Sequence, residues 1–97
     1  MTIPGPKRRK LKAQAHHLNP TIQIGKEGVT PAQIETIRRQ LDHHELIKIK
    51  FIEHKQQRRE LSTHIAQQTD SEAIDLIGNT LILYKQNPDP TKRKIEA

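Results

Sequence analysis

The clearest structural signal in the sequence lies in the segment 46–52. Apolar and basic side chains alternate there: Ile47, Ile49 and Phe51 are separated by Lys48 and Lys50. Because successive side chains of a strand point to opposite faces of a sheet, this alternation predicts a strand with one face in the core and one in water. Such a strand needs partner strands, and its apolar face needs a covering layer.

Further strands are predicted by β-branched and aliphatic runs at Thr21–Ile24, Ala73–Ile77 and Thr80–Tyr84. The last two runs flank the dipeptide Gly78-Asn79. A two-residue connection with glycine first suits a type II′ turn. The end of the chain is therefore predicted to form a β-hairpin.

Three helices are predicted between the strands. The first begins near Pro6, has Leu11, Ala15 and Leu18 on one face, and ends before Pro20. The second begins at Thr30-Pro31-Ala32-Gln33, which has the form of a capping box with proline at the first helical position, and ends near His44. The third covers about 56–68.

The resulting order, α-β-α-β-α-β-β, predicts an α/β fold with a four-stranded mixed sheet. Polar residues at alternate strand positions (Gln23, Lys48, Lys50 and Asp75) indicate that one sheet face is open to water. We therefore expect two layers with the helices on one side. A chain of 97 residues suits one domain, which we place at 7–85, with a flexible N-terminus at 1–6 and a flexible basic tail at 86–97.

The net charge of +6 is confined to one end of the sequence. Residues 1–26 hold six basic side chains and no acid, whereas residues 27–97 hold 11 basic and 11 acidic ones. The six are Lys7, Arg8, Arg9, Lys10, Lys12 and Lys26. A solvated helix face normally mixes both signs, so this segment is typical of a surface that binds a polyanion.

The loop Gly25-Lys26-Glu27-Gly28 joins the first predicted strand to the capped helix. Glycines allow the backbone to turn with positive φ and to approach a ligand closely, and a helix N-terminus attracts a phosphate. A Gly-x-x-Gly sequence alone fits an ordinary turn. Its place beside the acid-free segment favours contact with a nucleic-acid backbone, made by Gly25, Lys26, Glu27, Gly28, Val29 and Thr30 together with the basic helix.

Composition excludes several other classes of site. The chain has no cysteine and neither a membrane-length apolar run nor the apolar core of a secretory signal, so we expect a cytoplasmic protein. His16-His17 and His43-His44 have no metal-ligand spacing, so we expect no metal and no cofactor. We also expect neither a membrane nor a small-molecule substrate as a partner.

Two alternatives to a non-enzymatic RNA-binding protein remain at this point. One is an adaptor of the translation machinery that binds protein through the open sheet face around Lys48 and Lys50. The other is a metal-dependent nuclease that uses Asp70, Glu72 and Asp75 near His64, although their spacing does not converge on one point.

Four segments together resemble the YhbY-type CRM domain, across about 7–85. They are Leu11–Pro20 (LKAQAHHLNP), Ile22–Thr30 (IQIGKEGVT), His44–Lys50 (HELIKIK) and Ile77–Tyr84 (IGNTLILY). The resemblance implies an RNA-binding module similar to the C-terminal domain of translation initiation factor three, with strand order 1-2-4-3. It also implies ribosomal RNA or a large-subunit precursor as partner, and hence a role in assembly of the large ribosomal subunit. The family's GxxG loop and basic first helix correspond to Gly25–Gly28 and Lys7–Lys12.

Overall fold

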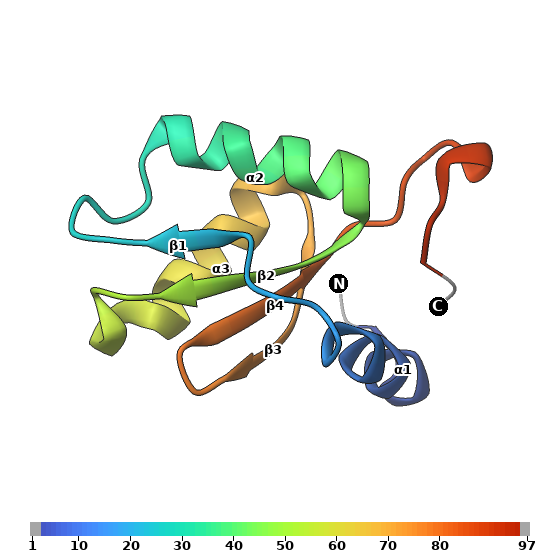
Figure 1. Ribbon diagram of the computed structural model, residues 1–97, viewed down its shortest axis with the longest axis horizontal. Helices are drawn as coiled ribbons and strands as arrows, with labels where there is room; N and C mark the ends of the chain where they lie inside the picture. The colour runs from blue at the N-terminus through green and yellow to red at the C-terminus, as the bar shows by residue number, and fades with distance from the viewer. Residues whose placement is uncertain (1–2, 96–97) are drawn as a thin grey trace.

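A computed structural model describes residues 3–95 of the chain, which form a sheet with helices on both of its faces (Figure 1). The helices and strands, in chain order, are α1 (Gly5–Ala15), β1 (Ile22–Ile24), α2 (Pro31–His44), β2 (Leu46–Phe51), α3 (Arg58–Thr69), β3 (Glu72–Ile77) and β4 (Thr80–Tyr84). Short 3₁₀ turns at Lys55–Gln57 and Pro90–Lys92 complete the secondary structure of the described residues. The predicted order of elements is therefore confirmed.

The strands form one mixed sheet in the order β1-β2-β4-β3. β1 runs parallel to β2, with Ile24 opposite Phe51, whereas β4 is antiparallel to both of its neighbours. At the β3–β4 turn Gly78 has φ +59°, and Asn79 is outside the positive-φ region, as the predicted type II′ turn requires. The order 1-2-4-3 that the family resemblance implied is confirmed.

The main core lies between the sheet and the helices α2 and α3. Ile47, Ile49 and Phe51 of β2 are all buried in it, as their alternation predicted. Helix α2 contributes Ile34, Ile37 and Leu41, and α3 contributes Ile65. This core contains no aromatic side chain other than Phe51.

The expectation that all helices lie on one side of the sheet is wrong for α1. This helix packs against β2 and β3 on the opposite face, where Leu11 and Ala15 are fully buried. They form a second apolar cluster with Ile3, Leu46, Ile74, Ile82 and Tyr84. The physical reason is that β2 and β4 also carry apolar side chains on this second face, at one end of the sheet. These side chains are stabilised by burial under a helix.

Both ends of the described chain are attached to this second cluster. Ile3 is buried in it, and Ile95 packs against it. Residues 87–95 form a strap that is bonded to Glu45, as described below. The predicted flexibility of 1–6 and 86–97 stays a prediction, and its outermost parts, 1–2 and 96–97, lie outside the described residues.

Candidate nucleic-acid interface

The loop Gly25–Gly28 follows β1 directly and is closed by one backbone hydrogen bond. The N–H of Gly28 donates to the carbonyl oxygen of Gly25 at 3.0 Å. Gly28 has φ +69°, in the left-handed region that glycine adopts without strain, whereas Gly25 lies outside that region. The expectation of positive φ at both glycines is therefore confirmed for Gly28 and wrong for Gly25.

Neither the φ angle at position 25 nor steric crowding around it requires a glycine there. A Cβ atom built at Gly25 would meet no described atom within 4 Å. At Gly28 the same atom would lie 3.7 Å from Nε2 of His54, an ordinary van der Waals contact. The open space at Gly25 is the place where a ligand could approach the backbone closely.

Helix α2 begins next to this loop, and its first turn is mostly satisfied from within the protein. Oγ1 of Thr30 accepts a hydrogen bond from the N–H of Gln33 at 3.1 Å, so the predicted cap is confirmed. Pro31 has no N–H, which leaves the N–H of Ala32 for a ligand. The helix start thus offers fewer donors than the sequence suggested.

The other half of the predicted capping box is not formed. Nε2 of Gln33 donates to the carbonyl oxygen of Gln23 in β1 at 2.7 Å instead of returning to Thr30. This bond ties the first turn of α2 to the strand that precedes the glycine loop. Gln23 and Gln33 both line the groove described next.

A groove of about 550 Å³ runs between β1, the glycine loop and the first turns of α2. Its lining comprises Thr21, Ile22, Gln23, Gly25, Lys26, Glu27, Gly28, Thr30, Ala32, Gln33 and Thr36. Five of the six predicted loop residues are among them. The exception is Val29, whose partly buried side chain packs against the main core.

His54 supports the glycine loop from the segment that follows β2. Its Nε2 lies 2.8 Å from the carbonyl oxygen of Lys26. Because a carbonyl oxygen only accepts, Nε2 carries the hydrogen in this contact. His54 itself has φ +57°, which is uncommon for a residue other than glycine.

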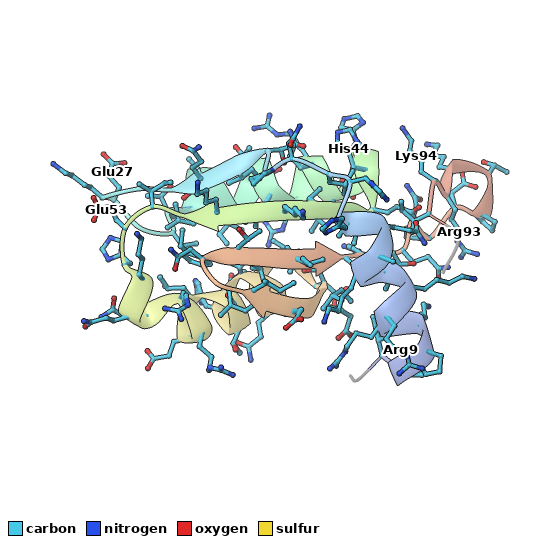
Figure 2. The ribbon with its side chains drawn as sticks, turned by 60° about the horizontal axis from the view of Figure 1, so that its bottom comes forward. Arg9, Glu27, His44, Glu53, Arg93 and Lys94 are labelled. Carbon is cyan, nitrogen blue, oxygen red and sulfur yellow. The ribbon has the colours of Figure 1, made fainter. Side chains whose placement is uncertain are left out.

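Sequence reasoning did not connect His54 with the loop. A signal was present, because neighbouring parallel strands end at the same edge of a sheet. The register Ile24 opposite Phe51 brings the residues that follow β1 beside those that follow β2. Glu27 and Glu53 accordingly lie at this same end of the molecule (Figure 2).

Helix α1 presents the basic residues that the sequence singled out. Arg8, Arg9 and Lys10 are exposed to solvent. Lys7 is partly buried, and its Nζ lies 5.7 Å from the centre of the Tyr84 ring, within the range of a cation–π contact. Leu18, predicted on the buried face of this helix, is 37% exposed because the helix ends at Ala15.

Lys12 differs from the other basic residues of α1 because it has an acidic partner. Its Nζ lies 2.8 Å from a carboxylate oxygen of Asp75 in β3, and both side chains are more than a third exposed. The hydrogen bond from Lys12 holds the pKa of Asp75 below its ordinary value, and Arg8 contributes in the same direction. Part of the charge of Lys12 is therefore balanced within the protein.

The structure does not bring the two predicted parts of the interface together. Helix α1 lies at one end of the sheet and the glycine loop at the other (Figure 1). Figure 2 shows the same separation, with Arg9 and Glu27 at opposite ends. The longest dimension of the molecule is 37 Å, so one phosphate group cannot contact both.

Basic side chains also lie on the sheet face between these two ends. Lys50 of β2 is exposed and lies opposite Gln23 of β1. Lys48 is half-buried, and its Nζ donates to the carbonyl oxygen of Leu18 at 3.1 Å. The β2 positions of this face that α1 leaves uncovered are thus basic, as the alternation in β2 predicted, and the exposed Ile77 of β3 lies near Lys48.

The described residues offer little for the alternative chemistries. Across 3–95, no group of three histidine or acidic side chains could hold a metal ion. The rings of His16 and His17 are 5.8 Å apart and pack edge to face. Of the acidic residues considered for a nuclease, Asp75 is engaged by Lys12. None of the helices in the same range has the length and hydrophobicity needed to cross a bilayer.

The fold, the groove beside the glycine loop and the exposed cations of α1 define a small single-sheet α/β module with an extended polar surface. The model of the CRS1 / YhbY (CRM) domain matches residues 3–85. The chain belongs to this family.

Curated relatives cover nearly the whole chain. "Probable RNA-binding protein YqeI" of Bacillus subtilis is 32% identical over 88 residues, which are 90% of this chain and 92% of YqeI. A protein of Haemophilus influenzae named "RNA-binding protein" is 33% identical over 89 residues, 91% of this chain and 90% of its own. The solution structure of SAV1595 from Staphylococcus aureus is also similar, with a TM-score of 0.80 and 27% identity over 98% of this chain and 100% of that one.

Proposed function

We propose that this protein binds RNA through its sugar–phosphate backbone, at the glycine loop and at helix α1, without catalysing a reaction. The observation that carries the proposal is the open backbone at Gly25, which adjoins a groove of about 550 Å³ and the free N–H of Ala32. Backbone N–H groups at such a turn bind phosphate oxygens. The names of the curated relatives support RNA as the ligand.

The separation of the two contact regions favours a structured RNA over a short single strand. Contacts at opposite ends of a molecule 37 Å long require a ligand of comparable length and defined shape. Lys50 and Lys48 lie between the ends and extend the attraction for phosphates across the sheet face.

Base stacking on aromatic side chains contributes little to this mode of binding. The chain has two aromatic residues in the phenylalanine, tyrosine and tryptophan class, and both Phe51 and Tyr84 are buried. Single-strand-binding modules rely on exposed aromatic platforms. Recognition here depends on backbone contacts and on the shape of the RNA.

We further propose ribosomal RNA of the large subunit, or its precursor, as the target, and assembly of that subunit in the cytoplasm as the process. The support for this finer assignment is the resemblance of the four sequence segments to the YhbY-type CRM domain, which implies such a target. Crosslinking the protein to RNA in cells and sequencing the attached fragments tests it. Fragments spread over messenger and transfer RNA with no enrichment of large-subunit sequences would refute the assignment.

The contact surface itself is tested by the dependence of RNA affinity on salt. Replacing Arg8, Arg9 and Lys10 by glutamine removes the three exposed cations of α1. The slope of log affinity against log salt should become shallower by about 0.7–0.9 for each lost phosphate contact, the higher figure applying to a duplex, or by about 2–3 in all. A control replaces Arg39 of α2 and Arg59 of α3 by glutamine, which removes two exposed cations away from α1 and from the glycine loop. An equal loss of slope per removed charge in both variants would show that only the net charge matters.

A further inference from the structure

The C-terminal strap, residues 87–95, is attached to a single buried carboxylate. Glu45 follows α2 and has no exposed surface. One of its carboxylate oxygens accepts a hydrogen bond from the N–H of Asn87 at 2.5 Å. The other accepts from the N–H groups of Lys94 at 2.5 Å and Ile95 at 2.9 Å.

The backbone of Glu45 takes part in the same attachment. Its carbonyl oxygen accepts a hydrogen bond from the N–H of Lys85 at 2.8 Å, at the point where the chain leaves β4. Nδ2 of Asn87 also donates to the carbonyl oxygen of Asp42 at 3.4 Å. The end of α2 therefore holds the chain from residue 85 to residue 95.

A glutamate at this position is unusual on two grounds. Its φ of +61° lies in a region that residues other than glycine rarely adopt. Its charge is buried, which is unfavourable unless hydrogen bonds compensate for the lost water. Here three backbone N–H groups of the strap provide this compensation. The carboxylate and the strap thus depend on each other.

The attachment brings the end of the strap onto the apolar cluster that α1 covers. Ile95 packs on the cluster that contains Leu11 and Ala15 of that helix. The strap and α1 lie at the same end of the sheet in both views (Figures 1 and 2). Lys92, Arg93 and Lys94 of the strap are exposed there.

The charges of the strap are mostly available to a ligand. Nε of Arg93 donates to the carbonyl oxygen of Asn87 at 3.0 Å, so this side chain is partly engaged within the strap. Asp89, the acidic residue of the segment, is bonded to the N–H and hydroxyl of Thr91. Lys92 and Lys94 therefore add two exposed cations to those of α1.

We propose that Glu45 is a positioning residue that holds Lys92 and Lys94 at the end of the sheet that α1 covers, so that the strap extends the cationic surface of α1 for the RNA backbone. The proposal rests on the proposed RNA-binding function and adds the C-terminal strap to the surface. It has an unexpected consequence for charge: removing the negative charge of Glu45 should weaken RNA binding instead of strengthening it.

The attachment is tested first without RNA. In Glu45→Gln the side-chain amide places a donor where the strap presents N–H donors, so at least one strap hydrogen bond is lost. Amide hydrogen exchange at Asn87, Lys94 and Ile95 should become faster than in the parent protein, while exchange in β2 and β4 stays slow. Unchanged exchange at the three strap amides would overturn the role of Glu45.

The RNA surface is tested with Lys92→Gln/Lys94→Gln and with a large-subunit ribosomal RNA fragment as probe. Both residues are exposed, so the double variant should melt like the parent protein. Its salt slope should be shallower by about 1.4–1.8, which corresponds to two lost phosphate contacts. An unchanged slope, with the parent still binding in a salt-dependent manner, overturns this inference and leaves the proposed function intact. Absence of salt-dependent binding by the parent overturns the proposed function itself.

Asp42→Asn is the matched control for Glu45→Gln. Asp42 is exposed near the end of the same helix, and its side chain makes no bond to the strap among the described contacts. Both substitutions remove one negative charge. We expect Asp42→Asn to bind RNA at least as tightly as the parent and Glu45→Gln to bind more weakly. Equal strengthening in both variants would show that Glu45 acts by charge alone.

Discussion

Replacing each loop glycine by alanine separates the needs of the fold from the needs of binding. At Gly25 the added Cβ atom meets no described atom within 4 Å, and φ is outside the left-handed region. Gly25→Ala should therefore leave stability unchanged or raise it by about 0.4–1 kcal/mol, because alanine restricts the unfolded chain. Its RNA affinity should nevertheless fall, because the methyl group occupies the space through which a phosphate reaches the backbone.

Gly28→Ala should have the opposite balance. The new Cβ would lie 3.7 Å from His54, which is no clash, but φ +69° is unfavourable for alanine by about 1–2 kcal/mol. For a domain of this size, each 1 kcal/mol lowers the melting temperature by about 4–8 °C. The loss of RNA affinity should be no larger than for Gly25→Ala as long as the protein remains folded.

The assay is thermal melting of both variants and the parent. RNA binding is measured for the same three proteins at one fixed salt concentration and at a temperature well below the melting range. We expect Gly25→Ala to be the more stable of the two variants and to bind RNA no more tightly than Gly28→Ala. If Gly25→Ala binds RNA like the parent, the open space at Gly25 is not a phosphate contact and the loop is an ordinary turn.

Three further predictions concern single side chains. His54→Ala removes the bond to the carbonyl oxygen of Lys26 and should weaken RNA binding with little change in melting temperature; unchanged affinity would show that the loop needs no support. Burial raises the pKa of Glu45, but the N–H groups of the strap and the charge of Arg93 outweigh it and hold this pKa below its ordinary value. The ionised carboxylate of Glu45 therefore contributes fully to stability above the pKa that it has in the unfolded chain, and this contribution is lost as pH falls through the lower pKa of the folded protein. In urea titrations, the difference in unfolding free energy between the parent and Glu45→Gln should shrink below about pH 4.5. The hydroxyl of Tyr84 is buried and has no hydrogen-bond partner among residues 3–95, so Tyr84→Phe should be neutral or stabilising by about 1 kcal/mol in the same titrations, and a clear destabilisation would contradict this.

The order of elements was predictable because local patterns determine it. The alternation around Ile49, the cap at Thr30 and the turn at Gly78 are each set by neighbours within a few residues. The structure confirms all three features. The pairing of strands also followed from the family resemblance, which carries information that local patterns lack.

The position of α1 was not predicted, because a helical stripe does not say which face of a sheet it covers. The lysines of β2 suggested an open face, but Leu46, Ile82 and Tyr84 make one end of that face apolar. Helix α1 covers this end, and the lysines occupy the remainder. The sequence contained this signal in β4, whose residues 81–84 are all buried and so line both faces.

The contacts of Glu45 and His54 could not be predicted from the sequence. Glu45 meets Lys94 and Ile95 across about half the length of the chain, and His54 meets Lys26 across two adjacent loops. Such contacts depend on which loops and chain segments the pairing of the strands brings side by side. The charge count of the sequence likewise gave no indication that Lys12 is paired with Asp75.

The central claim is that RNA lies across both ends of the sheet, and mapping of backbone amide NMR shifts during titration with a large-subunit ribosomal RNA fragment tests it most directly. We predict that Gly25, Lys26, Gly28 and Ala32 shift together with the amides of α1, at the same RNA concentration, and that the shifts shrink together as salt is raised. Shifts confined to the outer faces of α2 and α3, or restricted to one end of the sheet, would contradict the account.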